Sequence, residues 1–153
     1  MKKKIIIGGV LFFIVLGLAA AYYIFQPHRD VQATSADIEI GSRELVQEFV
    51  KSNMDANDKY LAADGESKIL AITGKVSTIE KDGAGLSVVL LKDAGDEMGV
   101  SCTFLKEFTA ELSNVKVGDE ITVKGVIRSG AEYDEDLELY EDAIVEKCSM
   151  YQK

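Results

Sequence analysis

Few side chains in this sequence have a type and a spacing suited to catalysis. The one histidine, His28, stands between Pro27 and Arg29, close to the amino terminus. A serine or cysteine triad built on a histidine of the remaining chain is therefore excluded. Carboxylates are abundant, but a catalytic pair requires two carboxylates held at a defined distance around a substrate. The sequence predicts a protein that is not an enzyme and that uses no cofactor.

The densest acidic stretch runs from Glu132 to Asp142. Hard cations such as Ca²⁺ bind several oxygen ligands, so calcium is conceivable there. The stretch lacks the Asp-x-Asp-x-Asp-Gly spacing of a calcium loop. A solvated acidic loop is the favoured interpretation, and no metal site is predicted.

The two cysteines, Cys102 and Cys148, are far apart and match neither a Cys-x-x-Cys motif nor a zinc-ligand spacing. Redox chemistry and metal ligation are therefore not expected. An oxidising compartment outside the cytoplasm permits a disulfide, which would contribute on the order of 4 kcal/mol for so long a loop. Two separate buried thiols are the favoured alternative, because a disulfide requires Cα atoms within about 7 Å.

A run of 21 uncharged residues, 5–25, follows three lysines at positions 2–4. A helix of this length crosses about 30 Å of hydrocarbon at about 1.5 Å per residue. The lysines favour a cytoplasmic amino terminus, residues 1–4. The pattern predicts a single-pass protein of the inner membrane, anchored by this helix, whose carboxyl-terminal domain lies in the periplasm.

A cleaved secretory signal is the alternative for this segment, because Ala19, Ala20 and Ala21 match the small residues of a cleavage site. A retained anchor is favoured. The apolar run continues beyond the alanines to Tyr22 and Phe25, and aromatic rings at the membrane interface anchor a spanning helix. Both interpretations export the domain.

The next segment, residues 26–41, is polar and reads as a linker. An amphipathic helix that packs on the domain core is predicted for residues 42–64, with Ser42 as its cap. Its apolar residues recur at helical spacing and are Leu45, Val46, Phe49, Val50, Met54, Tyr60 and Leu61.

From residue 67 onward, short β-branched runs alternate with turn residues, which is typical of a small all-β domain. Five strands are predicted, at residues 69–80, 86–91, 98–104, 120–128 and 136–146, with a short helix at 105–115 before the fourth. This order is that of an OB-fold, a five-stranded Greek-key barrel, here spanning residues 65–150. The fold class is therefore mostly β with helices.

Period-two alternation in these strands predicts which side chains enter the barrel. Cys102 points inward in the third strand, while Gly74 and Gly125 allow the first and fourth strands to coil sharply. The outward polar positions form a candidate ligand-binding cluster. Its members are Lys75, Ser77, Ser101, Thr103, Lys124 and Arg128.

The charge of the chain argues against nucleic acid as a partner. The formal charge is −9, and without the three amino-terminal lysines 14 basic side chains face 26 acidic ones, a charge of −12. Binding to a phosphate backbone relies on concentrated lysine and arginine, and single strands also need exposed aromatic rings. The candidate cluster offers no aromatic platform. The favoured interpretation of the cluster is a solvated surface. The alternative is a site that binds a polypeptide, a glycan or a small ligand.

The whole chain is therefore predicted to be a binding module that recognises an envelope protein or a small ligand near the membrane. Two alternatives stay open. One is nucleic-acid binding through the barrel, and the other is a structural accessory subunit of a membrane complex.

Several short motifs resemble the tRNA_anti-like family, bacterial proteins that are membrane-associated or exported and have an expected OB-fold. The resemblance implies kinship of fold with the anticodon-binding barrels of tRNA-handling enzymes, and no activity. The sequence departs from the family where Gly125 is followed by Val126, Ile127 and Arg128 with no cysteine, so no cysteine pairing is carried over. The matching residues are Pro27, His28, Arg29, Asp30 and Val31, then Asn53, Ala56, Asn57, Asp58, Lys59 and Tyr60, Gly74, Lys75 and Val76, Gly99, Val100, Ser101, Cys102, Thr103 and Phe104, and Gly118, Asp119, Glu120, Ile121, Thr122, Val123, Lys124 and Gly125.

Overall fold

A computed structural model of the protein describes residues 14–18, which are helical, and residues 29–152. Most of the predicted membrane span and His28 lie outside the described residues. No helix within these two ranges has the length and apolar character needed to cross a membrane.

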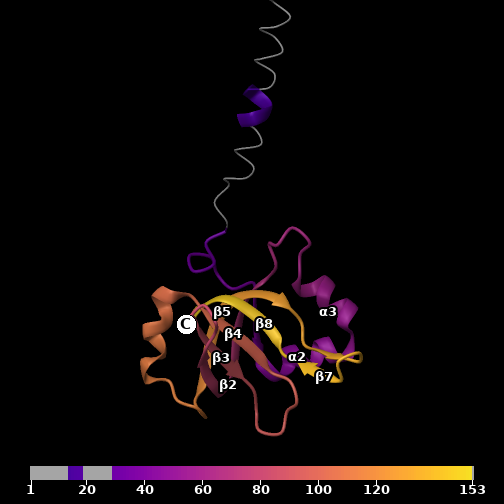
Figure 1. The fold of residues 1–153 in the computed structure, drawn as a ribbon, viewed down its shortest axis with the longest axis vertical. Coiled ribbons are helices and arrows are strands. Elements are labelled where there is room, and N and C mark those ends of the chain that lie inside the picture. Colours follow the sequence, from indigo (N-terminus) through magenta and orange to yellow (C-terminus); the bar gives the residue numbers. More distant parts are fainter. Residues whose placement is uncertain (1–13, 19–28, 153) are drawn as a thin grey trace, which may run out of the picture.

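Five strands close into a barrel in the order β2-β3-β4-β8-β5, and β5 pairs with β2 to complete the ring (Figure 1). β2 pairs antiparallel with both β3 and β5, β4 pairs antiparallel with β3, and β8 pairs parallel with β4 and antiparallel with β5. This is the closed arrangement expected of an OB-fold, and it confirms the predicted barrel. The bounds are β2 Ile69–Lys81, β3 Ser87–Leu91, β4 Val100–Phe104, β5 Glu120–Ser129 and β8 Ala143–Met150.

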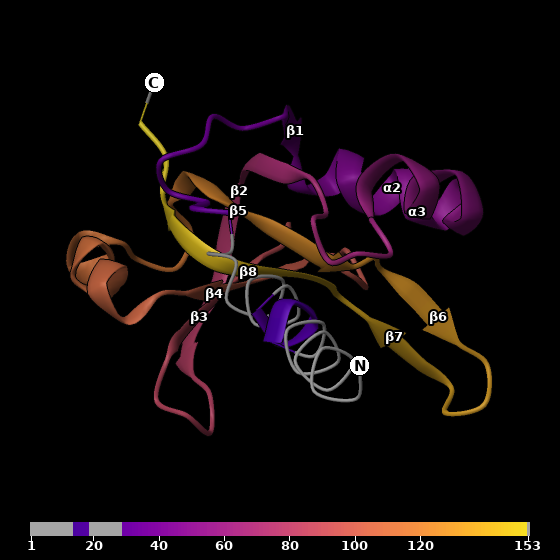
Figure 2. The ribbon, with the colours of Figure 1, turned by 90° about the horizontal axis from the view of Figure 1, so that it is seen from above.

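Helices cover two opposite sides of the barrel (Figure 2). On one side lie α2 (Ser42–Lys51) and α3 (Asn53–Tyr60), and on the other lies the 3₁₀ helix η1 (Lys106–Asn114). The single helix predicted from residue 42 is wrong in one respect, because it breaks at Ser52. The Ser52 side chain accepts a hydrogen bond from the Asp55 amide at 3.4 Å and so starts a second helix.

Ser42 was expected to cap the first helix, but Gly41 occupies the cap position. Ser42 is instead buried against β2. A side chain added at Gly74 would place its Cβ 2.8 Å from the Ser42 Cβ, so the glycine allows α2 to begin directly on the barrel.

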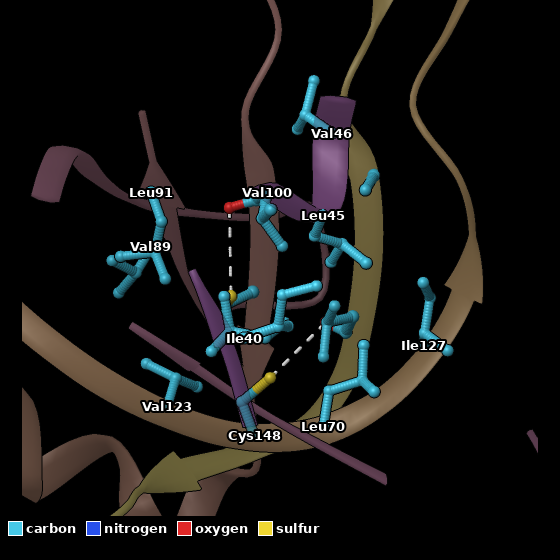
Figure 3. Packing of buried hydrophobic residues seen from close by; sticks show 14 of the residues in the cluster. Ile40, Leu45, Val46, Leu70, Val89, Leu91, Val100, Val123, Ile127 and Cys148 are labelled. Carbon is cyan, nitrogen blue, oxygen red and sulfur yellow. Dashed lines mark hydrogen bonds between the residues drawn. The ribbon is translucent and has the colours of Figure 1, made fainter. Parts of the chain in front are cut away.

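The core fills the barrel from all five strands and from α2 (Figure 3). Its pattern follows the strand pleat, because Val100, Cys102 and Phe104 of β4 are buried while Ser101 and Thr103 between them are half-buried. Cys102 therefore points inward, as predicted. Fully burying a large apolar side chain stabilises the fold by about 1.5–3 kcal/mol. The largest side chains buried in this way include Tyr60, Phe49, Phe104, Leu45, Leu70, Ile72, Leu91 and Ile127.

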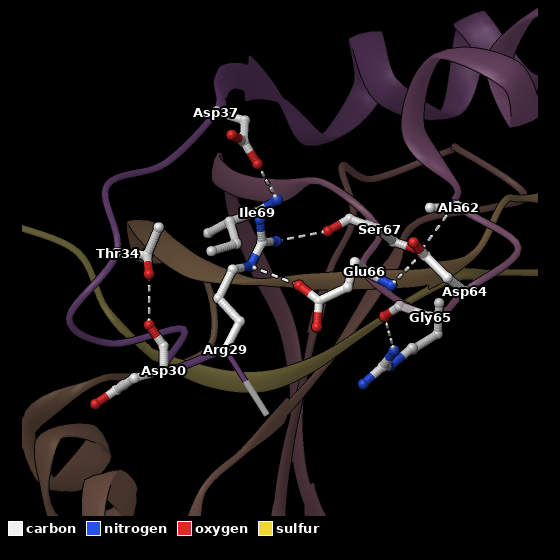
Figure 4. A network of polar contacts seen from close by, with 11 residues as sticks. Arg29, Asp30, Thr34, Asp37, Ala62, Asp64, Gly65, Glu66, Ser67 and Ile69 are labelled. Atoms are coloured by element: carbon white, nitrogen blue, oxygen red, sulfur yellow. Dashed lines mark hydrogen bonds and ion pairs between the residues drawn. The ribbon is translucent and has the colours of Figure 1, made fainter. Parts of the chain in front are cut away.

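The segment before α2 differs from the predicted linker. Residues 29–37, here called the strap, lie against the barrel, and strand β1 (Ile38–Gly41) follows and pairs parallel with β2. Val31 is buried against Ile69 and Val126. The Asp37 carboxylate accepts a hydrogen bond from the Ile69 amide at 2.8 Å (Figure 4). Apolar anchoring and long-range hydrogen bonds thus hold a segment whose composition alone suggests a tether.

The predicted fifth strand is also wrong in its bounds. The acidic stretch forms its own hairpin, β6 (Glu132–Asp134) with β7 (Leu139–Glu141), and β8 begins only at Ala143. The Asp134 carboxylate accepts hydrogen bonds from the amides of Asp136 and Leu137, at 2.8 and 2.9 Å. These local bonds close the turn of the hairpin.

One ion pair joins the two helices and predicts how stability depends on pH. Lys59 donates to the Glu48 carboxylate at 2.7 Å, and the Tyr60 hydroxyl donates to it at 2.8 Å. These bonds, that of Lys59 foremost, hold the pKa of Glu48 below its usual 4.5. A lowered folded-state pKa gives stability that is present above pH 4.5 and is lost as pH falls below it.

The variant Glu48→Gln is therefore expected to lose stability less steeply than the parent below about pH 4.5. The free energy of unfolding in denaturant, measured across that pH range, checks the expectation. Glu44→Gln, which removes an exposed carboxylate of the same helix, is the matched control. An identical acid slope for Glu48→Gln and the parent would contradict the assignment.

Candidate functional site

The six residues of the predicted candidate cluster do not share one surface. Lys75 is exposed on β2, opposite Glu120 of β5, and lines a shallow cavity of about 450 Å³ beside the start of α2. Ser77 lies at a bulge of β2, where the pairing with β3 shifts register between Val76 and Thr78. Lys75, Lys124 and Arg128 line three different cavities, so the cations of the predicted cluster are separated from one another.

Lys124 and Arg128, both of β5, are engaged by other parts of the protein. Lys124 is only 9% exposed and donates to the backbone carbonyl oxygens of Gln32 and Thr34 in the strap, at 2.9 and 3.1 Å. Arg128 pairs with Glu146 at 3.0 Å and donates to the Gly65 carbonyl oxygen at 3.1 Å. Neither cation is free to form the outer face that the alternation predicted.

Ser101 and Thr103 do point outward from β4, on the surface of the middle strands. Their neighbours across the strands are apolar: Ser101 lies opposite Leu90 of β3 and Ile144 of β8, and Thr103 lies opposite Val88. Ile144 is 42% exposed. This surface is weakly polar and carries no concentration of positive charge, so it lacks the character of a phosphate-binding groove.

The most distinctive exposed feature is an aromatic pair on the β6–β7 hairpin. Tyr133 and Tyr140 lie directly opposite each other, with ring centroids 4.8 Å apart and an interplanar angle of 48°. They are 47% and 49% exposed. Leu137, in the turn of the same hairpin, is exposed as well. These three residues are called the hairpin patch below.

Acidic groups surround the hairpin patch. Seven acidic and no basic residues lie between Glu132 and Asp142. Glu97, from the β3–β4 loop, forms a hydrogen bond with the Tyr140 hydroxyl and, with the negative charge nearby, raises the pKa of that tyrosine above its usual 10.0. The patch thus combines two aromatic rings with a strongly negative potential, which suits cationic groups.

Contacts at its base fix the hairpin to the barrel. The Gly99 amide donates to the Asp142 carboxylate at 2.7 Å, and the Asn53 side chain of α3 donates to Glu132 at 3.3 Å. Ala131 is fully buried at the point where β5 leads into the hairpin. The hairpin therefore extends from a rigid base, beside α2 and α3 (Figure 2).

Sequence reasoning missed this aromatic pair. The sequence predicts an acidic loop there, and exposed aromatic rings were expected only on the barrel strands. The sequence does contain a signal for the pair. Tyr133 and Tyr140 are placed symmetrically about Asp136 and Leu137, which form the turn. A hairpin with this centre puts the two rings opposite each other.

Both cysteines are fully buried free thiols inside the barrel. Burial, and then the adjacent Cys102 thiol, raises the pKa of Cys148 well above its usual 9.0. The two side chains are neighbours, and a disulfide between them, which the sequence left open as the less favoured alternative, stays untested. Within residues 14–18 and 29–152, no three His, Cys, Asp or Glu side chains gather as metal ligands do.

Because the thiolate is the reactive form, the reduced native protein is expected to react with a maleimide only as fast as the barrel opens. Adding denaturant is expected to expose both thiols and to give rapid double labelling. Mass spectrometry of labelled protein over time checks this. Rapid single labelling of the folded protein would contradict the burial of Cys102 and Cys148.

A match to a protein-family model shows which family the chain belongs to. A family model described as tRNA_anti-like matches residues 1–136. The chain belongs to the tRNA_anti-like family. The match includes β2 to β5 and the first part of the β6–β7 hairpin, so it covers most of the tRNA_anti-like barrel described above.

A solved structure from Klebsiella pneumoniae supports the same fold for this tRNA_anti-like protein. A protein from Klebsiella pneumoniae, provisionally described as a nucleic acid-binding lipoprotein, is similar with a TM-score of 0.55 and 19% identity, covering 83% of this chain and 100% of its own. A provisional aspartyl-tRNA synthetase from Leishmania major gives a TM-score of 0.42 and 15% identity over 88% of this chain and 25% of its own. At such identities the first likeness concerns the fold alone. No curated protein matches the chain.

Proposed function

We propose that this tRNA_anti-like protein is a non-enzymatic binding module, anchored in the inner membrane by residues 5–25 and working in the periplasm. Its ligand is a basic, extended segment of an envelope protein, and its binding surface is the hairpin patch. The exposed pair Tyr133 and Tyr140 within an acidic hairpin is the observation that carries the proposal.

Charge and geometry support a basic polypeptide as the ligand. Lysine and arginine side chains are attracted to the faces of aromatic rings and to nearby carboxylates. Leu137, in the turn between the two strands, provides exposed apolar area next to the ring pair, as binding surfaces for polypeptides usually do. The contacts of Asp142 and Glu132 at the base of the hairpin keep it in place before binding, which lowers the entropic cost of association.

The uncharged run at residues 5–25 and the lysines that precede it support the location. The Klebsiella protein of similar fold is described as a lipoprotein, which agrees with a place in the envelope. The strap begins at Arg29, only four residues after the apolar run. A chain of four residues reaches about 14 Å at most, so this arrangement keeps the barrel near the membrane surface.

The experiment uses the full chain in mild detergent and two synthetic peptides. One peptide alternates lysine and valine over eight residues, and the other has the same pattern with glutamate in place of lysine. We expect the lysine peptide to bind with an affinity that falls as salt rises, and the glutamate peptide not to bind. Equal binding of both peptides, or none, would overturn the proposal.

A photo-crosslinking residue placed at Tyr140 in living cells tests the same proposal in the membrane. A basic segment of an envelope protein is expected to be linked at this position and not at Lys75, the matched control on the exposed part of β2. Crosslinks at both positions to one stoichiometric partner would instead favour a structural accessory subunit. Turnover of an envelope substrate by purified protein would overturn the non-enzymatic assignment.

Nucleic-acid binding is the second candidate, favoured by the description of the Klebsiella protein as nucleic acid-binding and by the family's kinship with anticodon-binding barrels. It predicts binding of a single-stranded oligonucleotide that weakens with salt and on Lys75→Glu. Lys124→Glu does not serve here, because Lys124 is buried under the strap. An absence of binding at low salt would eliminate this candidate.

A further inference from the structure

A second cavity lies on the side of the barrel away from the hairpin patch. It measures about 600 Å³, which falls in the usual range for small-molecule sites. The strap, η1, β5, the end of β8 and the two residues that follow β8 meet around it. Figure 2 shows η1 and the β6–β7 hairpin on opposite sides of the barrel. The lining residues are Gln32, Phe108, Glu111, Lys124, Ser149, Met150, Tyr151 and Gln152.

Lys124 brings a buried positive charge to this cavity. Its ammonium is held by the two strap carbonyl oxygens, which use two of its three N–H donors. No carboxylate of the described residues lies within ion-pairing distance of it. A charge removed from water is costly without a counter-charge, and Lys124 is nine-tenths buried. An anionic group in the cavity would supply the missing partner.

Glu111 of η1 brings the opposite charge. One of its carboxylate oxygens accepts a hydrogen bond from the Met150 amide at 2.7 Å, and the other has no partner among the described residues. Glu111 and Lys124 line the same cavity without forming an ion pair with each other. The cavity therefore has on its lining an exposed carboxylate and a buried ammonium that are not paired with each other.

Apolar surface completes the cavity. Phe108, Met150 and Tyr151 are each half-buried and line it, and the Lys124 ammonium lies 5.9 Å from the centre of the Tyr151 ring. An aromatic or aliphatic side chain of a ligand would find contact area there.

We propose that this cavity binds a small zwitterion, a free amino acid or a dipeptide with an apolar side chain. The ligand carboxylate accepts a hydrogen bond from Lys124, the ligand ammonium donates to Glu111, and the side chain packs against Phe108 and Tyr151. This inference is independent of the hairpin patch, and either can fail without the other.

The test titrates the full chain in mild detergent with four probes. Phenylalanine and the dipeptide Phe-Phe carry both charges, 3-phenylpropionate lacks the ammonium, and phenylalaninamide lacks the carboxylate. Isothermal titration gives affinities, and NMR shifts of the backbone amides of Glu111, Lys124 and Ser149 report the location. We expect one of the two zwitterions to bind about ten-fold or more tightly than either single-charge analogue. The ratio of the two zwitterion affinities distinguishes the amino acid from the peptide.

The variant Glu111→Gln keeps an acceptor for the Met150 amide and removes the charge. It is expected to lower zwitterion affinity about ten-fold and to leave the binding of 3-phenylpropionate unchanged. Lys124→Met is expected to abolish binding of both, and Lys75→Met, an exposed lysine of the neighbouring strand, is the matched control. Lys124→Met also removes two hydrogen bonds to the strap. If Lys124→Met unfolds for that reason, the effect of Glu111→Gln on zwitterion affinity decides whether the inference holds.

Two results would overturn the inference. One is an absence of binding by phenylalanine and Phe-Phe at millimolar concentration, with no shift at Glu111, Lys124 or Ser149. The other is zwitterion binding that Glu111→Gln leaves unchanged.

Discussion

Replacing Phe49 with alanine is expected to lower the free energy of unfolding by about 3–5 kcal/mol. Phe49 projects from α2 and is 1% exposed. Its ring lies 5.7 Å from the ring of Tyr60 and packs directly against Gly130, where β5 ends. The alanine variant leaves a cavity at the junction of α2, α3 and the base of the hairpin, and a closely packed interior relaxes only partly into such a cavity. Urea unfolding of the full chain in detergent measures the effect.

Gly130 gives this prediction an internal check. A Cβ at position 130 would lie 2.7 Å or less from atoms of the Phe49 ring, so Gly130→Ala is expected to be strongly destabilising in the parent protein. In the Phe49→Ala variant the space beside position 130 is empty, so Gly130→Ala is expected to lower the free energy of unfolding only slightly. The two changes are therefore expected to be coupled by about 1–3 kcal/mol.

Val50, the next residue of α2, provides the matched control. It is 60% exposed, and Val50→Ala is expected to change stability by no more than about 0.5 kcal/mol. Additive effects of Phe49→Ala and Gly130→Ala, or equal effects at positions 49 and 50, would show that Phe49 does not pack against Gly130 and the core as described.

Removing both aromatic rings of the hairpin, by Tyr133→Ala with Tyr140→Ala, is expected to weaken binding of the lysine peptide about ten-fold or more. Each cation–π contact contributes about 0.5–2 kcal/mol, and the two rings face the same ligand. Because both rings are about half exposed, the midpoint of thermal unfolding is expected to change little. Titration of the peptide and a thermal scan of the same samples measure the two quantities.

The conservative variant Tyr133→Phe with Tyr140→Phe separates the rings from the hydroxyl groups. It keeps the ring pair and loses the Tyr140 hydrogen bond to Glu97, so it is expected to retain most of the peptide affinity. If the alanine variants bound the peptide as tightly as the parent, the hairpin patch would not be the binding surface. A large fall in unfolding temperature would mean instead that the tyrosines are structural.

The positions of the first four barrel strands, their inward side chains and the order of the barrel could be predicted from the sequence, because each depends on local periodicity. Alternation along β4 placed Cys102 inside and Ser101 and Thr103 outside, as observed. The family motifs also lie in contiguous stretches of the chain, and the family match confirms what they indicated.

The candidate sites were decided by contacts between segments far apart in the chain. The pleat alone put Lys124 on an outer face, yet the strap, about 90 residues earlier, folds over it and buries its ammonium. Composition alone made residues 132–142 a loop, yet hydrogen bonds from Gly99 and Asn53 hold them as a hairpin with Tyr133 facing Tyr140. Local pattern fixes the direction of a side chain within its own strand, whereas what covers or faces that side chain depends on the packing of the complete chain, which only the tertiary structure determines.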